Sequence, residues 1–239
     1  MRTISRFLAV LTLVAFATCG WSAVYNPATA FEAGFAADMN PNGVWSYGYS
    51  LGFTSSITLF TNTVQGGFDS SNEQLWLTQS INVGDSPSVV YNNGPAFNDG
   101  NVAAAANQIL LVAGIQGQYA DLIFTAPGAG TYSLVGSFTG DQVNIGDFVG
   151  IVSNGSVVFN STVTSEGQIV AFTDNLTLAA GNTVAFSVGP DGGLQNVGLN
   201  LTISTGVTAT PDPSTVGLLG TGLIALVGLA KTQRLWRQR

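Results

Sequence analysis

The chain contains no histidine, and its only cysteine is Cys19. Without histidine, it cannot build a Ser-His-Asp or Cys-His catalytic site or an imidazole metal site. A single cysteine also excludes a structural zinc cluster and an internal disulfide. Charged residues make up only 8% of the 239 residues, against roughly 25% in an average soluble protein. The lack of histidine and of further cysteines therefore excludes several classes of enzyme and metal-binding protein.

The few basic residues lie only at the two ends of the chain. Between Phe7 and Ala230 there is no Lys, Arg or His, whereas all 13 acidic residues lie in this central part. Nucleic-acid binding depends on cations that neutralise phosphates, and a purely anionic section repels nucleic acids and anionic lipid surfaces. We therefore predict that nucleic acid is not a partner.

Residues 1–23 have the pattern of a secretory signal peptide. Arg2 and Arg6 form a positive start, Phe7 to Ala17 form a short apolar core, and small residues up to Ala23 offer cleavage points for signal peptidase. The apolar core is too short to span a membrane comfortably. The alternative is a retained membrane helix.

The C-terminal tail has three parts in a fixed order. A linker over 207–215 contains the prolines of Pro211-Asp212-Pro213-Ser214-Thr215, an apolar run follows over 216–230, and 231–239 is basic. Fifteen helical residues span about 23 Å, so the run predicts a short transmembrane helix. The basic residues that would stop it on the cytoplasmic side are Lys231, Arg234, Arg237 and Arg239.

This tail resembles the PEP-CTERM sorting signal of Gram-negative and related bacteria, which is also labelled an ice-binding-protein C-terminal motif. The resemblance covers residues 211–239, and Asp212 stands where the family has Glu. It implies recognition and cleavage by an exosortase, a membrane cysteine protease. The expected product is an exported protein, first anchored in the membrane and then placed at the cell surface or released.

Residues 24–206 predict a single all-β domain without a long helix. Tyr132, Leu134 and Phe138 alternate with polar residues, and the segments around Phe186 and Leu201 do the same. This period of two is typical of half-buried antiparallel sheets. About ten strands with no helix to cover them favour a two-sheet, jelly-roll-like β-sandwich. The Ala-rich stretch 102–108 predicts at most a turn or two of helix.

Turn residues separate the expected strands. Asn154-Gly155 is a strong hairpin signal, and turns are also expected at 127–130 and 180–182. The segments 40–50, 126–141 and 178–193 resemble blocks of exported PEP-CTERM ectodomains. That resemblance implies a β-sandwich similar in outline to jelly-roll carbohydrate-binding modules.

Two candidate ligand sites lie near residue 40. Asp38, Asn40 and Asn42 copy the opening of a calcium loop, but Tyr49 stands where an EF-hand needs its bidentate glutamate. The alternative there is a simple turn. Trp45, Tyr47 and Tyr49 share one strand face and could form a platform for a sugar ring, or they could belong to the core.

No carboxylate pair sits in a catalytic motif, and a serine or threonine nucleophile would lack a Lys or His base. We therefore expect a non-enzymatic protein that requires no cofactor. The main hypothesis is an exported surface or extracellular-matrix protein with a structural or adhesive role. The alternative is a carbohydrate-binding module that recognises an extracellular polysaccharide.

Overall fold

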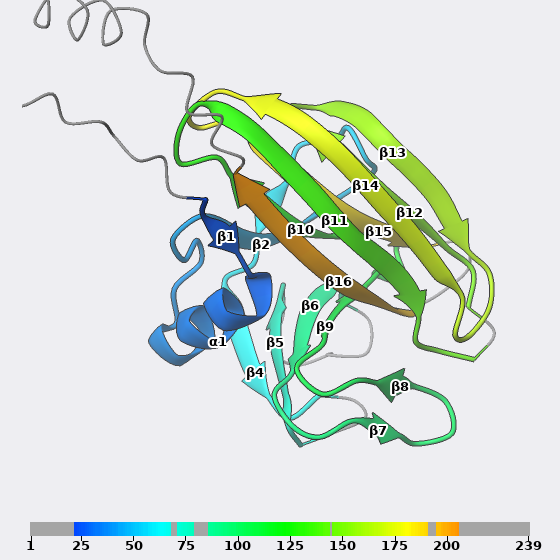
Figure 1. Ribbon diagram of the computed structural model, residues 1–239. Coiled ribbons are helices and arrows are strands. Elements are labelled where there is room, and N and C mark those ends of the chain that lie inside the picture. Colours follow the sequence, from blue (N-terminus) through cyan, green and yellow to red (C-terminus); the bar gives the residue numbers. More distant parts are fainter. Residues whose placement is uncertain (1–21, 68–70, 79–85, 144, 191–194, 206–239) are drawn as a thin grey trace, which may run out of the picture. The chain divides into compact units, whose positions relative to one another are not determined.

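Antiparallel strands stacked in two sheets form most of the structure (Figure 1). The computed structural model describes residues 22–67, 71–78, 86–143, 145–190 and 195–205. The first sheet, in spatial order, contains β14 (Ile169–Leu178), β11 (Gly130–Gly140), β16 (Asn196–Thr205), β9 (Ile109–Val112), β6 (Ser88–Asn92), β5 (Glu73–Leu77) and β4 (Asn62–Gln65), with β1 (Val24–Tyr25) also paired to β16. We call it sheet A.

The second sheet, sheet B, faces sheet A across the core. Its strands, in spatial order, are β13 (Ser156–Val163), β12 (Asp147–Ser153), β15 (Thr183–Pro190), β10 (Tyr119–Thr125), β2 (Trp45–Ser50) and β3 (Thr58–Leu59). The short strands β7 (Phe97–Asn98) and β8 (Ala103–Ala104) pair only with each other. The prediction of an all-β, two-sheet antiparallel sandwich is confirmed.

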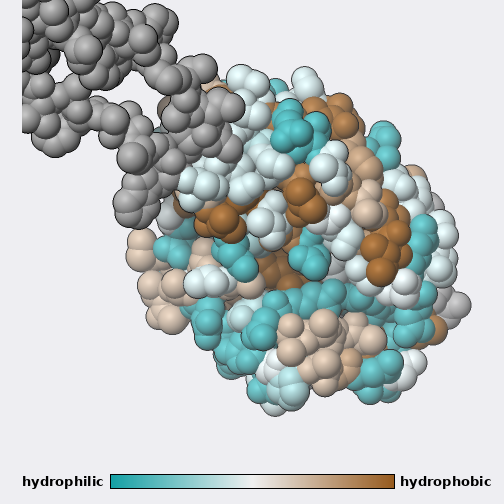
Figure 2. Space-filling view, in the orientation of Figure 1, coloured by the Kyte–Doolittle hydropathy of each residue, from teal (hydrophilic) through white to brown (hydrophobic). Residues whose placement is uncertain are grey.

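The core lies between the sheets and follows the period-two pattern. Tyr132, Leu134 and Phe138 of β11 are buried, and so are alternate residues of β15 and β16, including Phe186 and Leu201. On the solvent side of sheet A, apolar side chains are scattered among polar ones (Figure 2). Burial of the alternate aromatic and aliphatic residues is thus the main stabilising contribution that the sequence encodes.

The connections between strands are more varied than the turn signals suggested. Asn154 and Gly155, with φ of 49° and 78°, form the hairpin between β12 and β13, as expected. The turns at 127–130 and 180–182, however, carry the chain from one sheet to the other, because they join β10 to β11 and β14 to β15. A turn residue marks a reversal, but the pairing of the strands it joins is decided elsewhere.

The helix α1 (Pro27–Ala37) corrects the expectation that no helix of this length is present. The Asn26 side chain caps it by accepting a hydrogen bond from the Ala28 N–H at 2.9 Å, and Pro27 occupies its first turn. Phe31 points into the core, 4.9 Å from Tyr47 between ring centroids. The Ala-rich stretch 102–108, in contrast, contains the strand β8.

The expected signal-peptide core, the Pro-Asp-Pro motif and the expected transmembrane run all lie outside the described residues. Within the described residues, no helix has both the length and the apolar character that a membrane span requires.

Candidate functional site

The aromatic residues of β2 face the core, which corrects the prediction of a sugar platform. Trp45 and Tyr47 are 2% and 0% exposed. Trp45 packs on Phe124 at 5.3 Å, and Tyr49 stacks on Phe60 at 5.9 Å between ring centroids. The buried rings of Trp45 and Tyr47 offer no face to a sugar, and Tyr49 is half-buried against the same core, so the structure matches the alternative of core aromatics.

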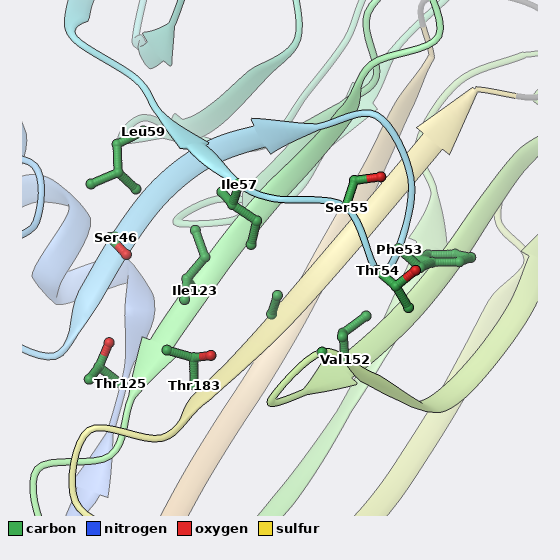
Figure 3. Close-up of a pocket in the computed structure, with 12 residues that line it drawn as sticks. Ser46, Phe53, Thr54, Ser55, Ile57, Leu59, Ile123, Thr125, Val152 and Thr183 are labelled. Carbon is green, nitrogen blue, oxygen red and sulfur yellow. The ribbon is translucent and has the colours of Figure 1, made fainter.

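The opposite face of β2 carries small residues, and a groove lies there. Ser46, Gly48 and Ser50 alternate with the aromatics and therefore point away from the core. After β2, the segment 51–57 crosses over sheet B before the chain enters β3, as Figure 3 shows. The groove beside this segment has a volume of about 370 Å³. It is lined by Ser46, Phe53, Thr54, Ser55, Ile57, Leu59, Ile123, Thr125, Val152, Gly155, Thr183 and Ala185.

The groove combines an apolar floor with a hydroxyl-bearing rim. Ile123, Val152 and Ala185, from three neighbouring strands, form a small buried cluster under Phe53. Ile57 and Leu59 are more exposed and add apolar walls, while the rim carries the hydroxyls of Ser46, Thr54, Ser55, Thr125 and Thr183. No charged residue belongs to this described lining. These walls favour an uncharged ligand with both apolar and hydroxyl surfaces.

Glycine allows the half-buried Phe53 ring to lie close against sheet B. A Cβ atom at Gly150 of β12 would approach the Phe53 ring to 2.5 Å. The Phe53 ring also meets the Tyr119 ring edge-on, with centroids 5.0 Å apart. The Phe53 ring therefore anchors the segment 51–57 on sheet B. It fits there because Gly150, beneath the ring, has no side chain.

A buried carboxyl group, Asp121, lies beside the groove in sheet B. In the register of β10, Asp121 is opposite Gly48 on one side and Ser187 on the other, two residues from Ile123. The Ser187 hydroxyl donates a hydrogen bond to Asp121 Oδ1. Burial raises the pKa of Asp121 to about 7, although hydrogen bonds from Ser187 and Ser50 offset part of this effect.

Asp141 is a second buried carboxyl group, outside the groove. Its Oδ2 atom lies above Gly198, where a Cβ atom would approach it to 2.2 Å. Burial raises the pKa of Asp141 to about 7; a hydrogen bond with the Gln108 side chain lowers it, and the charge of Glu166 raises it further. Neither aspartate can pair with a Lys, Arg or His side chain of the domain, because the sequence between Phe7 and Ala230 contains none.

The candidate calcium ligands lie at the end of α1, and two of them bind backbone groups. The Asn40 amide donates to the Tyr47 and Phe60 carbonyls at 2.7 and 2.9 Å, and its Oδ1 accepts the Tyr47 N–H at 3.0 Å. The Asn42 amide donates to the Ala30 carbonyl at 2.8 Å. Asp38 ends α1 in the left-handed conformation. This is the geometry expected of the turn alternative, and calcium binding stays a prediction.

The candidate sugar platform and the groove lie on opposite faces of the same strand, β2. Ser46, Gly48 and Ser50 were the available signal, because small residues alternating with aromatics leave room on their own side of a sheet. The segment 51–57 and Phe53 carried no motif that could point to a groove. Its other walls come from β10, β12 and β15, which are remote in sequence.

No protein-family model and no curated protein matches this chain. Among solved structures, it is similar to a family 35 carbohydrate-binding module from Clostridium thermocellum, with 18% identity, a TM-score of 0.29, and coverage of 55% of this chain and 87% of that chain. The family 36 module of a xylanase from the hindgut metagenome of Trinervitermes trinervoides has 15% identity and a TM-score of 0.30, over 57% and 98% of the two chains. A family 35 module from Paenibacillus barcinonensis has 13% identity and a TM-score of 0.29, over 69% and 100%. Similarities this low leave the function to be argued from the chain's own residues.

Proposed function

We propose that this protein is an exported surface protein that binds an uncharged extracellular polysaccharide through the groove on the outer face of sheet B. The observation that carries this proposal is the lining of the groove, with apolar walls, a hydroxyl-bearing rim and no charged side chain in its described residues. A sugar ring likewise combines apolar and hydroxyl surfaces, since its faces carry C–H groups and its edge carries hydroxyl groups. Apolar contact with Phe53, Ile57 and Leu59 would supply affinity, and the rim would orient the sugar.

The proposed activity is binding rather than catalysis. Glycoside hydrolysis needs two carboxyl groups about 5 to 9.5 Å apart, on either side of the scissile bond. The described lining of the groove contains neither Asp nor Glu. Asp121, the nearest carboxyl group in the sheet register, is only 1% exposed. A bound sugar would therefore meet hydroxyls and apolar groups, not a general acid.

The proposed role of the groove in sugar binding is tested by placing a large side chain in it. Thr183 lies on its rim, exposed at the start of β15, and its side chain takes no part in the core. We expect Thr183→Trp to weaken binding of the full-length, detergent-solubilised protein to insoluble neutral polysaccharides at least tenfold, measured by pull-down on cellulose, xylan and mannan.

The matched control is Thr202→Trp, because Thr202 is an exposed strand residue of β16 outside the lining of the groove. It should bind like the wild type. Absence of wild-type binding to all three polysaccharides, or equal binding by the two tryptophan variants, would reject the proposed function.

Export is the second part of the proposal, and its support is the distribution of charge. All basic residues lie in 1–6 and 231–239, where they would stay on the cytoplasmic side, while the acidic section between them crosses the membrane. Signal peptidase and an exosortase-type protease would then remove the two ends.

We expect mass spectrometry of the mature protein to find an N-terminus close to Ala23 and a C-terminus close to the Pro211-Asp212-Pro213 motif. Because Asp212 keeps the negative charge of the family's glutamate, its replacement by alanine should leave more of the protein at the precursor mass. Intact termini at both ends of protein from growing cells would contradict export by this route.

A second candidate function is a structural or adhesive role in the extracellular matrix. The observation that favours it is the exposed edge strand β13, which contains no charged residue.

A further inference from the structure

We propose that the outer edge of β13 pairs with the same edge of a second copy of this chain, so that sheet B continues from one molecule into the next. An edge strand presents unpaired N–H and C=O groups and so acts as a template for another strand. Natural proteins blunt such edges with short strands, charges, prolines or bulges. The described edges of this domain differ in how far they are blunted.

Three of the four edges of the two sheets are blunted by a short strand or by a charge. At one side, β3 is only two residues long and β4 only four. At the other side, β14 carries the charged Asp174 in its middle. The fourth edge, β13, runs for eight residues as Ser-Val-Val-Phe-Asn-Ser-Thr-Val without a charge or a proline. It pairs with β12 and ends sheet B.

The bulge in β13 leaves most of the strand regular. The register shifts between Ile151 and Val152 of β12, so the irregularity lies close to the hairpin turn. From Phe159 to Val163 the pairing with β12 is continuous. Strands of this composition, with high β-propensity, no charge and no proline, are the kind that associate edge to edge.

The distribution of charge permits a second copy as the partner at this edge. The domain has no cation, so two copies repel each other wherever their carboxylates face. In the hairpin formed by β12 and β13, the acidic Asp147 at the start of β12 is buried, and no acidic residue occurs between it and Glu166. Val157 and Val158, at 41% and 40% exposure, add apolar surface to this hairpin. Two copies can meet there without opposing carboxylates.

Two identical edge strands can pair antiparallel about a two-fold axis. In that arrangement the same stretch of β13 from each copy contacts its counterpart in the other copy. The outward-facing positions of the regular part are Asn160 and Thr162, since they lie opposite Gly150 and Phe148 on the outer face of sheet B. Such a contact joins two molecules. It uses none of the lining of the groove except the neighbouring hairpin residue Gly155.

Cysteine cross-linking of the full-length protein tests the proposal. In a Cys19→Ser background, single variants Val158→Cys, Asn160→Cys and Thr162→Cys are treated with a short bismaleimide and analysed by denaturing electrophoresis. We expect covalent dimer from at least one of them at five times or more the yield of Val135→Cys. Val135 is a matched control because it is exposed on β11, which pairs on both sides.

A second set of variants excludes chance collision. Asn160→Glu or Thr162→Glu, whichever position does not carry the cysteine of the best cross-linking variant, should reduce the dimer yield at least fivefold, because two glutamates would then lie close together on the outer face of the paired strands. Thr202→Glu on β16 should not reduce it. The proposal would be overturned by dimer yields no higher than that of the Val135→Cys control. It would also be overturned if the glutamate on β13 and Thr202→Glu on β16 gave equal dimer yields. Thr183→Trp should leave cross-linking unchanged, so failure of the groove and failure of the edge are distinguishable.

Discussion

Raising the pH from 5 to 8 should lower the free energy of unfolding of this protein by about 2–3 kcal/mol for each of Asp121 and Asp141. The pKa of each carboxyl group is raised by burial from 3.8 to about 7 in the folded protein. Between these two pKa values the folded state binds more protons than the unfolded state. Stability is therefore greatest below the unfolded pKa and is lost as the pH rises towards 7.

The test is Asp121→Asn, whose amide oxygen can still accept the hydrogen bond from the Ser187 hydroxyl. We expect this variant to be more stable than the wild type at pH 8 and to lose only about half as much stability between pH 5 and 8. Urea unfolding of the full-length protein at several pH values measures both quantities. Asp38→Asn is the control, since Asp38 is exposed, and it should keep the wild-type loss.

Two outcomes would contradict this explanation. If Asp121→Asn showed the same loss of stability with pH as the wild type, the Asp121 carboxyl group would ionise in the folded protein as readily as in the unfolded chain. If the wild type gained stability from pH 5 to 8, the sign of the effect would be wrong. Either result would mean that burial of these carboxyl groups does not govern how the stability of the protein changes with pH.

Trp45→Ala should lower the free energy of unfolding by about 3–5 kcal/mol, which is the usual effect of removing a buried aromatic side chain. Trp45 is 2% exposed and packs on Phe124, so its removal leaves a cavity between the sheets. Urea unfolding measures the loss. Phe148→Ala, at a position that is 38% exposed, should cost much less and serves as the control for loss of an aromatic ring.

The same variant separates the core role of Trp45 from a role in binding. Binding to neutral polysaccharide, measured per mole of folded protein, should be unchanged in Trp45→Ala, because Trp45 does not line the groove. Unchanged stability together with lost polysaccharide binding would restore the sugar-platform hypothesis and contradict the burial described for this residue.

The alternation of β2 shows how far sequence reasoning reaches. A period of two places Trp45 and Tyr47 on one face and Ser46 and Gly48 on the other. It does not say which face is covered by the second sheet. That depends on elements outside sheet B, such as β5 of sheet A and α1, whose Trp76 and Phe31 pack on Tyr47. The candidate sugar platform was therefore assigned to the face that the tertiary structure buries.

Helix α1 was missed for a related reason. Its sequence, Pro-Ala-Thr-Ala-Phe-Glu-Ala-Gly-Phe-Ala-Ala, is short and small-residue-rich and has a weak apolar stripe. Its N-cap Asn26 and Pro27 were readable signals. What stabilises it beyond them is the burial of Phe31 against Tyr47, which exists only once the sheets have formed.

Composition and local pattern were enough to determine that this chain has a cation-free central domain between two basic ends, and that the domain is built from alternating β-strands. These properties depend on residue types and on the two-residue period of a strand, both of which are local. Only the tertiary structure decided which strand faces are buried, where the chain crosses between sheets, that Asp121 is enclosed, and that the segment 51–57 forms a groove with β10, β12 and β15. Each of these depends on contacts between residues far apart in the chain, and burial is a property of the assembled sheets rather than of any single segment.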